Sequence, residues 1–157
     1  MESILKTCQG MQERRFERGD VVLEEGNAGG ALLILAEGSV EILKQEYQIN
    51  TVESAGSIFG DVSVLLGLNH MATVKALEPC RFYVAVDALE FLKSNPEVHL
   101  HLSTLLAKRL NSVTNYLVDL KSQFEDRDDH LGMVDEVLES LLHHQADKST
   151  PSSAGGM

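Results

Sequence analysis

The sequence predicts a mainly β domain, a barrel or a sandwich, followed by one long helix. Short runs rich in β-branched and apolar residues fill the stretch from Phe16 to Val86, separated by turn residues. Such spacing is typical of an all-β barrel or sandwich. Asn95 followed by Pro96 combines a helix N-cap with a proline at the first helical position. A heptad pattern of apolar residues begins at Leu106 and predicts that the helix is long.

Composition places the chain among ordinary globular proteins. Its 157 residues are 43% hydrophobic and 24% charged, enough for one domain with a buried core. Asp and Glu number 24 against 13 Lys and Arg, and the net charge of −11 repels nucleic acid and anionic membranes. No apolar run approaches the length of about 20 residues that spans a bilayer, and the N-terminus has no signal-peptide pattern. Cys8 and Cys80 are isolated thiols, so we expect a protein of the reducing cytoplasm.

Local signals divide the chain into segments. Asp87 and Glu90 form a capping box that opens a short helix after the last β-rich run. Gly132 and the acidic residues before it weaken the helical pattern, which predicts a separate terminal helix. The small, polar tail is expected to be disordered. The predicted segments are an N-terminal helical segment at 1–15, the β-rich domain at 16–93, the long helix at 94–125, the terminal helix at 131–144 and the tail at 146–157.

The long helix carries a narrow apolar seam. Its members follow one another by alternating steps of four and three residues, which places them at heptad positions a and d. A seam sustained in this way favours a coiled-coil homodimer. The alternative is a helix lying on its own barrel, which also needs an apolar stripe. The sequence leaves open whether 131–144 extends the coil or folds back on the barrel. The seam consists of Leu106, Leu110, Val113, Leu117, Leu120 and Phe124.

The order of these elements, together with their glycines, resembles the cyclic nucleotide-binding domain family of the catabolite-activator and protein-kinase-A regulatory-subunit type. The resemblance runs from about Phe16 to Leu120 and rests on FERGDVVLEEGNAGGALLILAEGSVEI, GSIFGDVSVLL, HMATVKA and AKRL. It implies a β-roll (jelly-roll) barrel, a phosphate-binding cassette between two strands and a long C-terminal helix that covers the pocket and often forms the dimer. The glycines that match those of the family are Gly19, Gly26, Gly38, Gly56 and Gly60.

The same resemblance assigns the cassette to the stretch FGDVSVLLGLNHMATV. Gly60 supplies the turn, Asp61 falls where the family has a ribose-binding glutamate, and His70 falls at the family's phosphate-binding arginine. Backbone amides at the start of the short helical turn would face the phosphate. The candidate ligand-binding residues are Phe59, Gly60, Asp61, Val62, Ser63, His70, Met71 and Ala72, with Val113 and Thr114 near where the covering helix touches the base.

Departures from the family pattern predict that binding of cAMP or cGMP is weakened or lost. A histidine side chain is mostly neutral at pH 7 and offers one donor in place of the fork of an arginine. Losing one side of a buried charge-assisted contact costs about 2 to 5 kcal/mol, or about one to three and a half decades of affinity. Met71 adds bulk without a hydrogen bond. Two alternatives stay open: FGD and HMATV only turn the chain, or His70 replaces the arginine in a working sensor of cAMP, cGMP or another nucleotide.

No pattern favours an enzyme or a metal site. GxSxG, HExxH and P-loop motifs are absent from the sequence. His99 and His101 point to different sides of a helix and have no third ligand at suitable spacing. A jelly-roll enzyme of the cupin kind needs several histidines on the strands, and only His70 lies in the β region.

DNA binding is also unexpected. The residues after Phe124 are too few for a winged helix-turn-helix, and they carry HLGMVDEVLESLLHH in place of a basic recognition helix. The sequence therefore predicts a stand-alone, non-enzymatic regulatory module without a cofactor, a DNA contact or a membrane contact. We expect it to form a homodimer through the long helix and to act on another signalling protein.

Overall fold

The computed structural model describes residues 2–124 and 128–143. The chain divides into two compact units, one up to Leu102 and one from Ser103 onward. The helices are α1 (Glu2–Cys8), α2 (Asp61–Leu66), α3 (Ala88–Ser94), α4 (Pro96–Gln123) and α5 (Asp128–His143). The strands are β1 (Gln12–Phe16), β2 (Val21–Leu23), β3 (Leu32–Glu37), β4 (Val40–Lys44), β5 (Tyr47–Val52), β6 (Ile58–Phe59), β7 (Thr73–Ala76) and β8 (Cys80–Ala85).

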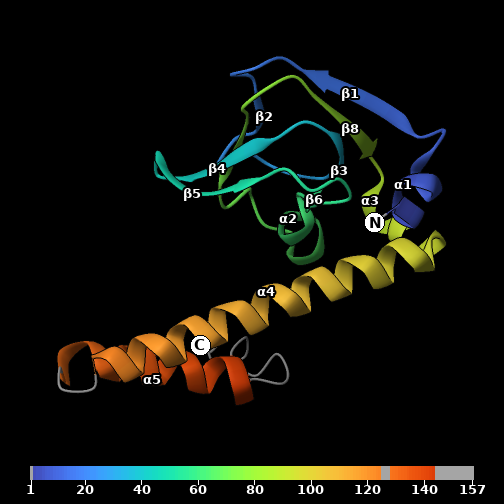
Figure 1. The fold of residues 1–157 in the computed structure, drawn as a ribbon. Helices are drawn as coiled ribbons and strands as arrows, with labels where there is room; N and C mark the ends of the chain where they lie inside the picture. The colour runs from blue at the N-terminus through green and yellow to red at the C-terminus, as the bar shows by residue number, and fades with distance from the viewer. Residues whose placement is uncertain (1, 125–127, 144–157) are drawn as a thin grey trace. The chain divides into compact units, whose positions relative to one another are not determined.

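The strands of the first unit form two antiparallel four-stranded sheets (Figure 1). One sheet has the order β1-β8-β3-β6, and the other has the order β2-β7-β4-β5. Among the strands that the structure describes, only β4 and β5 are neighbours both in a sheet and in sequence. The other pairs join distant strands, since β8 pairs with both β1 and β3, β7 pairs with both β2 and β4, and β3 pairs with β6. This arrangement confirms the predicted β-roll, with a short helix before it and a long helix after it.

Aromatic packing at the centre of the roll fixes where the candidate cassette begins. The Phe82 ring is fully buried and meets Phe16 and Phe59 edge to face, at centroid separations of 5.6 and 5.9 Å. Such edge-to-face pairs stabilise a core beyond the burial of their area. Phe59 is the last residue of β6, so the same cluster anchors the turn that leads into α2.

Two predicted boundaries differ from the structure. α1 ends at Cys8, and β1 already begins at Gln12, inside the segment 1–15 that the sequence assigned to a helix. The reason is tertiary pairing, because Gln12 lies opposite Val84 of β8. Gly132 lies inside α5 and does not break it. The predicted tail at 146–157 lies outside the described residues.

In the second unit α5 runs back along the distal part of α4 (Figure 1). Lys121 of α4 forms an ion pair with Asp135 of α5, and Val134 of α5 is buried. Leu117 and Leu120 of the seam are half-buried, whereas Leu110 and Val113 are exposed. Across residues 2–124 and 128–143, we find no helix with the length and apolar character to cross a bilayer.

Candidate functional site

A glycine turn opens the candidate cassette. Gly60 has φ of +85°, and a Cβ built on it would lie 2.6 Å from the carbonyl oxygen of Ala31. Both the left-handed backbone and the close approach require glycine. α2 then begins at Asp61, and the Val64 N–H donates to the Gly60 carbonyl at 3.0 Å. Gly67 ends the helix with φ of +69°, and its N–H donates to the Ser63 carbonyl at 2.9 Å.

The side chain of His70 points into the protein. It is 9% exposed, and a hydrogen bond of 2.9 Å joins its Nδ1 to the hydroxyl of Ser63 on α2. Its ring also lies against the backbone of Gly29, where a Cβ would come within 2.5 Å of Cε1. The ring is therefore held between the helical turn and the loop before β3.

The main chain of His70 also makes two hydrogen bonds. Its N–H donates to the carbonyl of Asn27 at 2.8 Å, and its carbonyl accepts from the N–H of Gly26 at 2.9 Å. These two bonds clamp the segment before β7 to the loop after β2. Rotation of the ring out of the cassette would break the Ser63 bond but would leave this clamp in place.

The cation Lys44 contacts the main chain of Met71, the residue that follows His70. Nζ of Lys44 donates to the carbonyl of Met71 at 2.6 Å and lies 3.2 Å from a carboxylate oxygen of Glu25. The other carboxylate oxygen of Glu25 accepts from the N–H of Gln45 at 3.0 Å. The Gln45 amide and the Lys44 ammonium hold the pKa of Glu25 below its usual range. Lys44 thus has an anionic partner of its own.

The structure brings most of the sequence-predicted residues together. Phe59, Asp61, Ser63 and His70 are buried, Val62 and Ala72 are half-buried, and Met71 is exposed. Val113 and Thr114 belong to the second unit, where the Thr114 hydroxyl donates to the Leu110 carbonyl at 2.8 Å.

Sequence reasoning missed Gly29 and Lys44. Gly29 belongs to the run EEGNAGG, which reads as an ordinary turn until the structure places His70 against it. No local pattern links Lys44 to Met71, because the contact joins the end of β4 to the segment before β7.

The side chain of His101, also in the first unit, contacts the backbone of the β-roll. Nε2 of His101 lies 3.0 Å from the carbonyl oxygen of Gly56, which ties the start of α4 to the turn before β6. Among the described residues, no three His, Cys, Asp or Glu side chains gather in a way that could hold a metal ion. The cassette offers hydrogen-bonding groups from Asp61, Ser63, His70 and backbone amides.

The sequence profile of the cyclic nucleotide-binding domain matches residues 13–92. The chain belongs to this family. The match covers the β-roll, the cassette and α3, so the cyclic nucleotide-binding domain of this chain includes every contact of His70 described above.

Individual relatives agree with this assignment. The chain is 28% identical over 92 residues to a cAMP-dependent protein kinase regulatory subunit of Yarrowia lipolytica, with 59% of this chain and 24% of that protein covered. It is 31% identical over 125 residues to a Rhodopseudomonas palustris protein named as a potassium channel protein, with 76% and 30% covered. The chain thus spans less than a third of either relative's length.

Among solved structures, the catabolite activator protein of Thermus thermophilus superimposes on the cyclic nucleotide-binding domain with a TM-score of 0.64. The identity is 25%, and the superposition covers 78% of this chain and 60% of that one. The likeness extends the family assignment from sequence to three-dimensional fold.

Proposed function

We propose that this chain is a non-enzymatic regulatory module whose cassette has weakened or lost cyclic-nucleotide binding and which acts as a dimer on another protein. One observation carries the proposal about the cassette: the ring of His70 is buried and hydrogen-bonded to Ser63. A phosphate is bound best where a side chain brings a full positive charge and a fork of donors, and here Nδ1 of the ring is already bonded to the protein's own helix.

The surrounding charges add to this argument. Asp61 is a buried acid at the start of the helix, and it supplies no positive charge to a phosphate. Lys44, the cation beside Met71, already pairs with Glu25. Neither Lys44 nor His70 therefore replaces the charge that an arginine would supply in the cassette.

Isothermal calorimetry with cAMP and with cGMP tests the proposal. The wild-type chain is expected to give no saturable heat in the micromolar range. The double variant His70→Arg/Met71→Ser is expected to bind measurably, with a gain of at least about tenfold, because a buried charge-assisted contact is worth about 2 to 5 kcal/mol. Low-micromolar binding of either nucleotide by the wild-type protein would overturn the proposal.

A matched control variant distinguishes the effect of the added positive charge from the effect of removing the two native side chains. His70→Gln/Met71→Ser removes the same two side chains without adding a positive charge, and it is expected to stay inactive towards both nucleotides. If the Gln variant gained as much affinity as the Arg variant, the missing charge would not be what closes the cassette to phosphate.

The proposal that the chain forms a dimer rests on the solvent-exposed residues of the seam. Leu110 and Val113 are exposed on α4, and apolar side chains repeated at heptad positions are typical of a helix that pairs with a second helix. Half-burial of Leu117 and Leu120 on the side of α4 shared with α5 suggests that the partner copy docks chiefly on the Leu110 end.

Two valines give a matched test of this interface. Val113 and Val118 are both 49% exposed on α4, but only Val113 belongs to the seam. Val113→Asp is expected to dissociate the dimer, since it buries a charge at an interface, while Val118→Asp leaves it intact. Light scattering at tens of micromolar decides, and a wild-type monomer at that concentration would contradict the dimer.

A second candidate function is a sensor that uses His70. No described buried side-chain nitrogen or oxygen lacks a partner. Nδ1 of His70 is bonded to Ser63, and Nε2 has no hydrogen bond within the described part of the chain, so solvent reaches it. A protonated imidazole carries a positive charge. This candidate predicts that cAMP or cGMP raises the melting temperature near pH 6 more than near pH 8. A flat response at both pH values would exclude it.

A further inference from the structure

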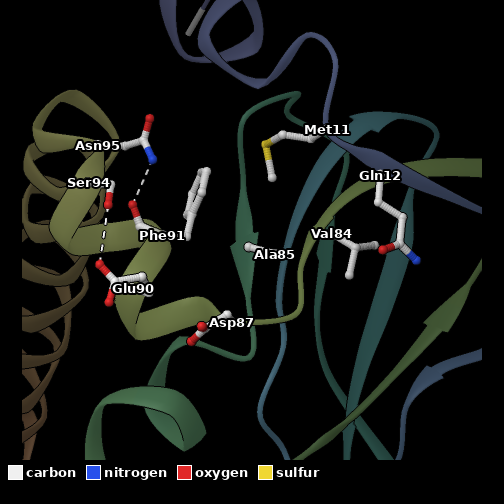
Figure 2. Close-up of a pocket in the computed structure, with 9 residues that line it drawn as sticks. All are labelled: Met11, Gln12, Val84, Ala85, Asp87, Glu90, Phe91, Ser94 and Asn95. Carbon is white, nitrogen blue, oxygen red and sulfur yellow. Dashed lines mark hydrogen bonds between the residues drawn. The ribbon is translucent and has the colours of Figure 1, made fainter.

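A cavity of about 400 Å³ lies at one end of the β-roll, between the β1–β8 pair and α3 (Figure 2). Its floor is formed by Val84 and Ala85, the last residues of β8, which are almost fully buried. None of its lining residues belongs to the cassette. It is therefore a different site from the one that the family assignment concerns.

The walls of this cavity are apolar and aromatic. Figure 2 shows the Phe91 ring projecting from α3 into the space, with the Met11 side chain on the opposite side. Both side chains are half-buried. The cavity opens widely to solvent, and between these two side chains it leaves room for a short apolar stem.

The polar part of the lining is acidic. Asp87 and Glu90 both line the cavity, and no lining residue carries a positive charge. Asp87 stands at the N-cap of α3, but its side chain makes no capping hydrogen bond. The Glu90 carboxylate has only a long contact from the Ser94 hydroxyl, at 3.4 Å. Both carboxylates are thus available to a group that enters from solvent.

We propose that this cavity binds an organic cation, a protonated amine or a guanidinium on a short apolar stem. The stem packs on Met11, Val84 and Ala85, and the charged head lies within reach of Asp87 and Glu90. The Phe91 ring adds a face on which a cation is stabilised by the ring quadrupole. The same chemistry is presented by a free amine and by a basic side chain of a partner peptide. This inference does not depend on whether the cassette binds a nucleotide.

Amide NMR titration of the full chain tests the proposal with three probes: isoamylamine, its neutral counterpart isoamyl alcohol, and the peptide acetyl-Leu-Arg-Leu-amide. Isoamylamine is expected to bind in the millimolar range, as its few atoms allow, with shifts at the amides of Ala85, Asp87 and Phe91. Tighter binding of the peptide would identify the source as a partner's side chain, and tighter binding of the amine would identify it as a free metabolite.

Variants chosen to preserve the fold measure how much each side chain contributes to binding. Asp87→Asn/Glu90→Gln retains a good N-cap residue and an acceptor for Ser94, and it is expected to weaken isoamylamine binding by about fivefold to tenfold. Phe91→Leu keeps an apolar wall and is expected to weaken it by about threefold. Glu53→Gln removes an exposed acid that does not line the cavity and is expected to change nothing.

Three results would overturn the proposal. One is the absence of saturable shifts with both cationic probes. Another is equal binding of isoamyl alcohol and isoamylamine, which would make the cavity merely apolar. The third is an equal loss of affinity in Glu53→Gln and Asp87→Asn/Glu90→Gln, which would reduce the effect to overall charge.

Discussion

The cassette and the cavity beside α3 are two concave regions of the same β-roll, and they differ in what fills them. In the cassette, His70 turns inward against Ser63 and Gly29 and takes up space within it. In the cavity, Phe91 and Met11 stand apart and leave about 400 Å³ open (Figure 2). Under the proposed function, a side chain of the protein itself fills the region that the sequence motif marks as a binding site, while the region without a motif is open.

Under the proposed function, the motif in this chain has kept the backbone of the site but not its chemistry. Gly60 must remain a glycine for the turn to exist at all, because its φ is positive and Ala31 lies against it. The two main-chain hydrogen bonds of His70 do not depend on its side chain, so under the proposed function the residue at this position makes a packing contact in place of a ligand contact. Binding capacity therefore has to be judged from side chains and open volume, not from glycines.

The largest expected effect on stability comes from adding one carbon to the wall of the cassette at Gly29. Gly29→Ala would place a Cβ 2.5 Å from Cε1 of His70 and 2.9 Å from Cβ of Ser63. Overpacking of this kind costs about 1 to 3 kcal/mol, and two simultaneous contacts favour the upper end. Urea unfolding measures the change in free energy. Gly30→Ala is the control, since a Cβ there meets nothing within 4 Å. Equal stability of the two variants would mean that the cassette has room.

A second prediction concerns the wall of the cavity at Met11, whose N–H donates to the carbonyl of Cys8. Burial raises the pKa of the Cys8 thiol from 9.0 to about 11. The folded state therefore disfavours the thiolate, and the stabilisation that this group contributes is fully present below pH 9 and is lost as the pH rises through about 11. A shift of this size corresponds to about 3 kcal/mol at most.

Urea unfolding at increasing alkaline pH, compared with Cys8→Ala, measures this loss. The wild-type chain is expected to lose more stability than the variant above pH 9. Amide shifts at Met11 should respond before those at His70, because Met11 is bonded directly to Cys8. Parallel loss in both proteins would show that the Cys8 thiol is not the group responsible.

Local signals explain which parts of the fold were predictable from sequence. Gly38 and Gly60 mark turns because their φ values are positive, and Pro96 marks the start of α4 because its ring suits the first helical turn. The inward orientation of His70 was not predictable, since it depends on Gly29 from a distant loop.

The same limit applies to β1 and to the cavity. The helical pattern near the N-terminus gave no indication that β8 would pair with Gln12. Residues of the cavity come from β1, β8, α3 and the residues that flank them, which only the tertiary fold brings together. Local backbone preferences are encoded in short stretches of sequence, whereas pocket walls are not.

A smaller effect is expected from removing the hydrogen bond that holds His70 inward. Ser63→Ala deletes the hydroxyl that is 2.9 Å from Nδ1 and leaves that nitrogen without its buried partner. The expected loss is about 1 to 2 kcal/mol. Ser57→Ala is a suitable control because its hydroxyl donates to the Ser54 carbonyl in an exposed turn. A loss for Ser63→Ala no greater than that of the control would indicate that the His70 ring is not fixed by this bond.

The smallest effect on stability is expected from a substitution in the cavity beside α3. Ala85→Val adds two methyl carbons at the floor of the cavity, and β-branched side chains suit a strand. Because the added carbons enter open volume, the free energy of unfolding should change by no more than about 0.5 kcal/mol, in contrast to the single carbon at Gly29. The same variant should weaken isoamylamine binding, since it fills the space that the stem would use. A destabilisation as large as that of Gly29→Ala would mean that the cavity is as tightly packed as the cassette, and the contrast between the two regions would disappear.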